Sequence, residues 1–179
     1  MKYYVFVDNS NVWIEGKFAS AVKQGFASNI IEAHRQNICD NSWGMDFGKL
    51  LYYVSDCEPQ KIEEAVIIGS KPTDKDSLWA AMETAGFRVS NHPRNASNRE
   101  KKVDTGIVQE INKILYKQSN EGDIFILALG DADYVPTVEA IKEEGRVVKV
   151  AFWSNVSGEL KAAANEYLDL TNIIEKIQY

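Results

Sequence analysis

The sequence predicts an α/β protein built on a mainly parallel sheet with helices on both faces. Five short runs rich in valine, isoleucine and aromatic residues have the composition of buried strands. Segments with apolar residues at helical spacing lie between these runs. Strands that alternate with helices form βαβ units, and such units build a parallel sheet.

The predicted strands, in chain order, are YYVFV (3–7), AVIIG (65–69), FRVS (87–90), IFILALG (124–130) and VVKVAFW (147–153). The predicted helices are 46–54, 76–86, 103–117 and 134–145. Two of them end in glycine, as helix C-termini often do, and 103–117 carries one apolar stripe. The stretch 15–45 has little periodicity, so we expect a helix plus an insertion over one sheet edge. SGELKAAANEYLDL and TNIIEKIQY finish the chain.

Composition narrows the class of protein. A chain of 179 residues fits a single domain, 1–179, and 45% hydrophobic with 26% charged residues is typical of a globular protein. The N-terminal apolar run is too short for a signal peptide, and no segment approaches a membrane span. Cys39 and Cys57 form no C-x-x-C pair, and His34 and His92 are isolated. We therefore expect reduced thiols in a cytoplasmic protein without membrane contact.

Acidic residues follow two of the predicted strands. Asp8 and Asn11 come after the first strand, and Asp131 and Asp133 come after the fourth. In an open parallel sheet, ligands bind beyond the carboxyl ends of the strands, where the strand order reverses. If the chain winds outward through strands two and three and then crosses back, strands one and four are neighbours. Asp8 and Asp131 would then face each other.

Asp104 opens the third helix at the same edge, in its first turn, so four carboxylates can meet. Their mutual repulsion would force protonation of one of them unless a cation is present. Mg²⁺ and Mn²⁺ prefer oxygen ligands. Such a site can activate water and stabilise the entering and leaving oxygens of a phosphodiester displacement.

Each polar residue also has a purely structural interpretation. Asp133 could cap the helix that contains Pro136, and Asp104 could favour the positive end of its helix. Asp8 could cap the helix after it, and Asn11 could satisfy loop backbone groups. Asp131 is the hardest to explain in this way, because it directly ends the strand.

Basic residues border the acids at the same predicted edge. The group is Arg94, Arg99, Lys101 and Lys102 before Asp104, with Lys71 and Lys75 after the second strand. A charge run is often just a solvated face, but beside a metal site it would suit a phosphate-binding groove. Against this, the net charge of -6 argues against a nucleic-acid coat protein. Trp13, Trp79 and Trp153 could stack bases, although core packing is expected for at least two of them.

With these motifs assembled, the chain resembles the NYN-domain family of PIN-like metal-dependent nucleases. The matching pieces are FVDNSN, KKVDTGI and LALGDADYVPTVEAIKEEGRVVKV, in this order and over most of the chain apart from 15–45. The resemblance implies a three-layer PIN-like, Rossmann-like fold with a five-stranded sheet of order 3-2-1-4-5. It implies a Mg²⁺ or Mn²⁺ site at Asp8, Asp104, Asp131 and Asp133, with Asn11 beside them, and RNA as the usual substrate.

The chain departs from the family at one position. Relatives often carry an aspartate after the last strand in an A-D-x-[FY] context, whereas here Ala164 is followed by Asn165. The resemblance and the basic residues together favour a ribonuclease whose 94–102 loop holds single-stranded RNA. The alternative is a binding module that keeps the fold and the cation but has no turnover. The insertion and the tryptophans are also compatible with a homodimer.

Other aspartate-rich folds fit less well. A haloacid-dehalogenase-type phosphatase needs D-x-D-x-[TV] at the first strand, where this chain has D-N-S-N. A Toprim-type site expects a glutamate after the first strand. A nicotinamide-binding fold would need G-x-G-x-x-G there, and this motif is absent.

Overall fold

The structure is a computed structural model that describes residues 1–70, 76–92 and 99–179. Within strands and helices it gives no side-chain description for residues 70, 76, 91, 92 and 99–104. No helix among the described residues is long and apolar enough to cross a membrane.

Within these residues the sheet has six strands, all paired in parallel in the order β3-β2-β1-β4-β5-β6. They are β1 (Tyr3–Asp8), β2 (Ile62–Ser70), β3 (Arg88–His92), β4 (Ile124–Ala128), β5 (Val147–Phe152) and β6 (Glu166–Asp169). The predicted α/β class and the order 3-2-1-4-5 are confirmed. The prediction of five strands was one short, because β6 adds a sixth at the β5 edge.

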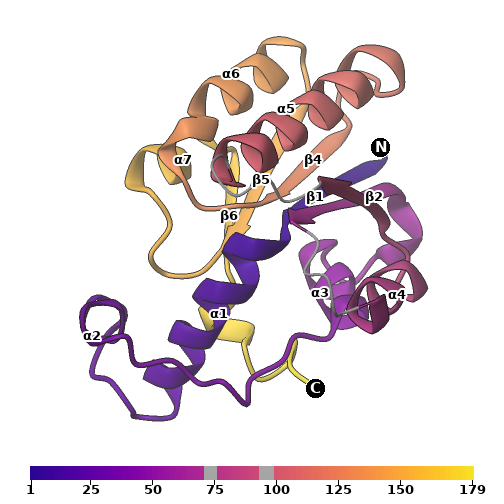
Figure 1. Cartoon of the computed structure of the whole chain (residues 1–179). Coiled ribbons are helices and arrows are strands. Elements are labelled where there is room, and N and C mark those ends of the chain that lie inside the picture. Colours follow the sequence, from indigo (N-terminus) through magenta and orange to yellow (C-terminus); the bar gives the residue numbers. More distant parts are fainter. Residues whose placement is uncertain (71–75, 93–98) are drawn as a thin grey trace.

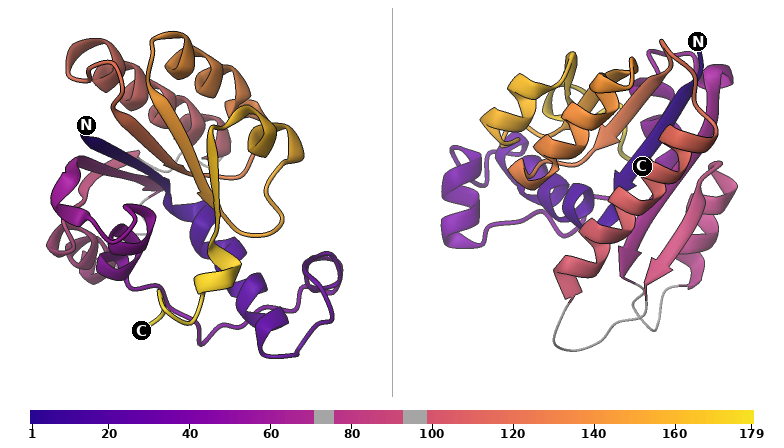
Figure 2. Two further views of the ribbon diagram at one scale, coloured as in Figure 1. Left: turned by 180° about the vertical axis from the view of Figure 1, so that it is seen from behind. Right: turned by 90° about the horizontal axis from the view of Figure 1, so that it is seen from above.

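The helices form a layer on each face of the sheet, as Figures 1 and 2 show. They are α1 (Asn9–Lys23), α2 (Ile30–Gln36), α3 (Phe47–Val54), α4 (Asp76–Thr84), α5 (Arg99–Lys117), α6 (Val135–Glu143) and α7 (Gly158–Ala163), with 3₁₀ turns η1 (Pro59–Lys61), η2 (Ala132–Tyr134) and η3 (Leu170–Ile173). In Figure 1, α5, α6 and α7 lie above the sheet, and α3 and α4 lie below it. The winding direction therefore reverses between β1 and β4, which makes this the switch point of the sheet.

The central strands are readable from the sequence because both of their faces are covered. Every residue of β1 is buried, and so are four of the five residues of β4. A strand enclosed in this way reads as a continuous apolar run. By contrast, β6 has the sequence EYLD and is only partly buried at the edge of the sheet. Its composition carries no comparable strand signal.

The helix predicted within the stretch 15–45 begins earlier than expected. Helix α1 starts at Asn9, directly after β1, and α2 packs against it through a small separate cluster of Phe18, Ala27 and Ala33. Asp40 fastens the chain after α2 to α1, because its carboxylate accepts hydrogen bonds from the Ser20 hydroxyl at 2.7 Å and the Ser42 backbone N–H at 2.9 Å. In Figure 1, α2 lies well away from the sheet, whereas Trp43 and Met45 after it are buried in the main core.

The tryptophans serve mainly the core. Trp79 and Trp153 are buried, and Trp153 donates its indole N–H to the Val12 carbonyl at 2.9 Å. Trp13 is half-buried and packs against Trp43 and Phe47. Core packing is thus confirmed for two of the three candidate base-stacking residues. The two cysteines are free thiols.

Candidate active site

Asp8 is the last residue of β1 and is buried, with 5% of its surface exposed. Its Oδ1 accepts a hydrogen bond from the Asn11 backbone N–H at 3.1 Å and so caps α1. The capping interpretation is therefore correct for Asp8. Although it caps α1, Asp8 still lies at the carboxyl edge of the sheet, as predicted.

Asp131 lies at the end of the neighbouring strand. β1 pairs with β4 up to Val7 and Ala128, and Gly130 connects β4 to Asp131. Asn11 donates from Nδ2 to Oδ2 of the exposed Asp131 at 3.1 Å. Asn11 therefore holds both acids, one through its backbone and one through its side chain.

Asp133 has a different position. It is exposed in η2, and the residue that caps α6 is Tyr134, so the predicted capping role of Asp133 is wrong. Pro136 does lie in the first turn of α6. Among residues with described side chains, no three His, Cys, Asp or Glu gather closely enough to hold a metal ion. The structure thus brings Asp8 and Asp131 together, without Asp133 as a third member of such a group.

The remaining predicted site residues lie where side chains are not described. Helix α5 begins at Arg99, four residues earlier than predicted, so position 104 is in its second turn and not its first. Because α5 connects the parallel strands β3 and β4 and packs on β1 and β2, its first turns lie at the carboxyl edge. Arg99, Lys101 and Lys102 share this part of α5. Arg94, Lys71 and Lys75 fall outside the described residues, and a role for these basic side chains stays a prediction.

Residues 154–158, which were not among the predicted site residues, form hydrogen bonds at this edge of the site. The Ser157 N–H donates to the Gly130 carbonyl at 2.9 Å, next to Asp131. Asn155 donates from Nδ2 to Oε2 of Glu15 at 2.6 Å, and the same oxygen lies 2.8 Å from Nε2 of His34. The segment after β5 thus fixes both the loop of Asp131 and the helix of Asn11. The sequence does contain a signal for this segment, because the polar run SNVSG (154–158) directly follows a buried strand.

Tyr167 fixes the start of that segment from β6. Its hydroxyl donates to the backbone carbonyls of Phe152 at 3.2 Å and Trp153 at 2.9 Å. Burial, together with the nearby charge of Asp169, raises the pKa of Tyr167 well above its usual value. The hydroxyl therefore stays protonated and keeps donating across the whole neutral range.

The donor atoms of the site suit a hard divalent cation. Asp8 and Asp131 offer carboxylate oxygens, the ligand type that Mg²⁺ and Mn²⁺ prefer. Mg²⁺ characteristically takes one or two carboxylates and completes its shell with water and substrate phosphate. Two carboxylates held by one asparagine fit this requirement.

Together, the strand order and the acids after β1 and β4 define a PIN-like α/β fold. A family model for the NYN domain matches residues 2–171, nearly the whole chain, so the protein belongs to the NYN domain family. Members of this family are usually nucleases and generally depend on a divalent metal. The resemblance inferred from FVDNSN, KKVDTGI and the GDADY region is therefore confirmed.

The fold also has a solved counterpart. A crystal structure of a protein of unknown function from Vibrio parahaemolyticus RIMD 2210633 superimposes with a TM-score of 0.70 and 19% sequence identity. The match covers 99% of this chain and 96% of that chain. At this identity it supports the fold alone. Among curated proteins, none matches this chain.

Proposed function

We propose that the protein is a Mg²⁺- or Mn²⁺-dependent ribonuclease that hydrolyses phosphodiester bonds of single-stranded RNA in the cytoplasm. The observation that carries this proposal is the double role of Asn11, which binds Asp8 through its backbone and Asp131 through its side chain. A shared hydrogen-bonding partner keeps two carboxylates oriented toward the same place. Membership of the NYN domain family supports the reaction class.

In this proposal each residue has a defined task. Asp8 and Asp131 hold the cation, with Asp104 and Asp133 as the further acids of the motif. Asn11 keeps the first two carboxylates in place. When bound, the cation supplies Lewis-acid stabilisation of the charge that develops on the phosphate oxygens. The basic residues Arg94, Arg99, Lys101 and Lys102 bind the phosphates on either side of the cleaved bond.

The decisive experiment is cleavage of end-labelled single-stranded RNA in Mn²⁺, Mg²⁺ or EDTA. Asp131→Asn is the control variant, because it keeps the side-chain volume and an oxygen that can accept from Asn11 but removes the charge. We expect products with Mn²⁺ or Mg²⁺, none in EDTA, and none from the variant. Equal cleavage by a folded Asp131→Asn protein would refute the assignment of Asp131.

The second candidate is a module that binds RNA or a protein partner without turnover. It is favoured by one observation: Asp8, Asp131 and Asp133 do not form a three-acid metal group among the described side chains. A net charge of -6 adds to it. Mn²⁺ binding that is lost in Asp131→Asn, with no cleavage by the native protein, would select this candidate.

A further inference from the structure

Glu15 lies one helical turn after Asn11 on the same side of α1. Residues four apart on a helix project from one face, about 6 Å from each other along the axis. Asn11 reaches the loop after β4, where its Nδ2 donates to Oδ2 of Asp131. Glu15 reaches the loop after β5, where its Oε2 accepts a hydrogen bond from Nδ2 of Asn155 at 2.6 Å. One face of α1 therefore contacts the loops that follow two neighbouring strands.

The two loops are also bonded to each other. The Ser157 N–H donates to the Gly130 carbonyl at 2.9 Å, and Gly130 directly precedes Asp131. The contacts therefore close a ring that runs from α1 through the loop after β5 to the loop after β4 and back to α1. In a connected network of this kind, removing one hydrogen bond weakens the hold on every member.

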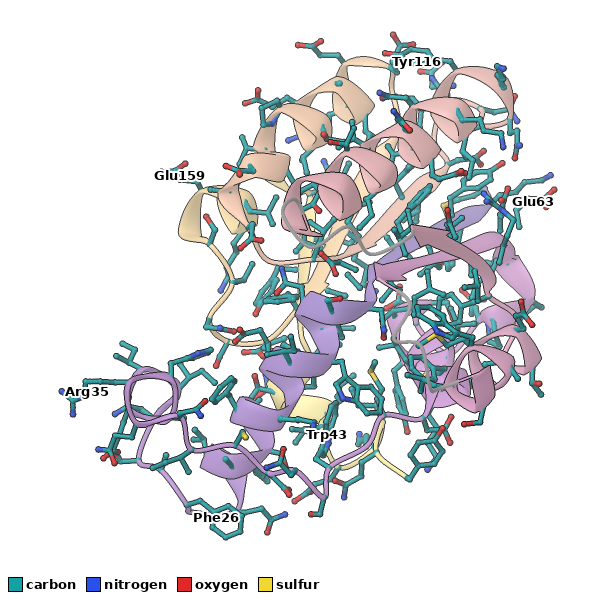
Figure 3. The ribbon with its side chains drawn as sticks, in the orientation of Figure 1. Phe26, Arg35, Trp43, Glu63, Tyr116 and Glu159 are labelled. Atoms are coloured by element: carbon teal, nitrogen blue, oxygen red, sulfur yellow. The ribbon has the colours of Figure 1, made fainter. Side chains whose placement is uncertain are left out.

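The side chain of Glu15 is held from a second side by α2. Its Oε2 lies 2.8 Å from Nε2 of His34, and the His34 ring stacks on Phe18 with the ring centroids 4.1 Å apart. Arg35 marks α2 in Figure 3, where this helix lies beside α1. Only 16% of the Glu15 side chain is exposed. A carboxylate fixed in this way loses little further rotamer freedom when it binds Asn155, and its hydrogen bonds are strengthened by its charge.

The bond to Glu15 extends an attachment that begins at the end of β5. Trp153 donates its indole N–H to the Val12 carbonyl at 2.9 Å, which joins the strand end to α1. Asn155 is exposed and lies two residues further along the chain, so its bond to Glu15 carries the attachment toward Ser157. Without this bond, Trp153 still fixes the strand end, but the loop beyond it is joined to α1 less firmly.

We propose that Glu15 is a positioning residue of the cation site. Acting through Asn155 and the loop after β5, it sets where Asp131 lies relative to Asp8. This inference rests on the proposed function, because it needs a cation at Asp131, and it adds a determinant of cation affinity outside the acidic motifs. Glu15 acts through hydrogen bonds and does not itself bind the cation.

The test measures Mn²⁺ binding by titration calorimetry, without RNA, in Glu15→Ala, Asn155→Ala and the double variant. We expect the dissociation constant for Mn²⁺ to rise about tenfold in each single variant, at the low end of the effect of residues that orient metal ligands. The double variant should bind no more weakly than the weaker single variant, because both changes remove the same hydrogen bond. Alanine is the best helix former, so Glu15→Ala keeps α1, and Asn155→Ala changes only an exposed loop residue.

Two further variants serve as controls. Glu15→Gln keeps an oxygen that can accept from Asn155, so Mn²⁺ affinity should return to within about twofold of the native value. Glu32→Ala is the matched control, because the Glu32 carboxylate accepts hydrogen bonds from Ser28 and Gln36 within the α2 segment. Its loss loosens that segment without touching the loop after β5, and Mn²⁺ affinity should stay native.

Amide hydrogen exchange without metal gives a readout that is independent of the cation. Exchange of residues 130–133 and 155–157 should be faster in Glu15→Ala and Asn155→Ala than in the native protein, and unchanged in Glu32→Ala. Native exchange and native Mn²⁺ affinity in both ring variants would overturn the inference. That result would mean that the hydrogen bonds of Trp153, Tyr167 and Thr171 hold the loop without Glu15.

The remaining outcomes separate this inference from the proposed function. A native protein that binds Mn²⁺ but cleaves no RNA, with affinity lowered in Glu15→Ala and kept in Glu32→Ala, supports the positioning role and refutes the nuclease. Mn²⁺-dependent cleavage whose Mn²⁺ requirement is the same in the native protein and in Glu15→Ala supports the nuclease and overturns the positioning role. A native protein that neither binds Mn²⁺ nor cleaves RNA overturns both.

Discussion

Replacing Gly130 with alanine is expected to displace Asp131 and weaken metal binding at the proposed site. Gly130 is buried between β4 and Asp131. An added Cβ would overlap the ring of Phe152, with Cζ at 2.7 Å and two further ring carbons closer still. Phe152 is 2% exposed and packed in the core, so its ring has little room to turn away. The backbone that carries Asp131 must therefore shift.

The magnitude follows from the cost of overpacking, which is typically about 1–3 kcal/mol. For a chain of this length, each kcal/mol lowers Tm by about 2–4 °C, so we expect a decrease of about 4–8 °C for a cost near 2 kcal/mol. A shift of the Gly130 backbone also disturbs the hydrogen bond from the Ser157 N–H to its carbonyl. Because the shift also moves Asp131, the affinity of the folded protein for Mn²⁺ should fall as well, beyond any effect of the lower stability.

The assay pairs thermal unfolding with Mn²⁺ titration calorimetry at a temperature where every variant is folded. Gly158→Ala is the control, because nothing lies within 4 Å of the added Cβ, and both Tm and Mn²⁺ affinity should stay native. Adding Phe152→Leu to Gly130→Ala should recover part of both losses, since the smaller side chain yields to the new Cβ. An unchanged Tm and Mn²⁺ affinity in Gly130→Ala would refute the steric argument.

Three further predictions address the acids and the basic residues. Asp8→Asn should abolish Mn²⁺-dependent RNA cleavage in a protein that still folds, and unchanged cleavage would remove Asp8 from the site. The double variant Lys101→Ala, Lys102→Ala should weaken RNA binding and lower the slope of log affinity against log salt by roughly 2, whereas an unaltered slope would leave these lysines a solvated surface. Hydrogen bonds from Ser42 and Ser20 hold the pKa of Asp40 below its usual value. The charged form of Asp40 therefore stabilises the fold at neutral pH, and this contribution is lost as the pH falls below about 4. Asp40→Asn should therefore lower the free energy of unfolding at pH 7 by about 1–3 kcal/mol. It should also make Tm depend less on pH in the acid range, and a variant whose Tm falls with acid as steeply as that of the native protein would contradict this role.

The sequence predicted the sheet better than it predicted the starts of the helices. Strands buried on both faces can be recognised in the sequence as continuous apolar runs. The order of these strands followed from the family motifs. The start of α5 was misplaced because Arg99 to Lys102 carry no apolar residue, so the periodicity begins only at Val103. The start of α1 at Asn9 agrees with the interpretation of Asp8 as a helix cap, whereas the periodicity of the stretch 15–45 did not define where its helix begins.

The candidate site could be predicted only where it depends on strand ends. Asp8 and Asp131 meet because their strands are neighbours at the switch point, a consequence of topology. The close packing of the Trp79 and Asn9 side chains against Gly69, by contrast, is a tertiary property. No local pattern in the sequence encodes it, and a glycine at the end of a strand reads simply as a turn.

The amide at position 165, where relatives often carry an acid, acquires a clear meaning from the sheet. Asn165 pairs with both backbone groups of Val148: its N–H donates to the Val148 carbonyl at 2.9 Å, and its Oδ1 accepts from the Val148 N–H at 2.8 Å. Val148 is near the start of β5, and four residues at about 3.3 Å each separate it from Phe152 at the carboxyl end, about 13 Å away. An acid at position 165 would thus lie at the edge of the sheet opposite Asp8 and Asp131. The amide lies directly before β6, away from the two acids, so it gives no support to the binding-module candidate over the nuclease.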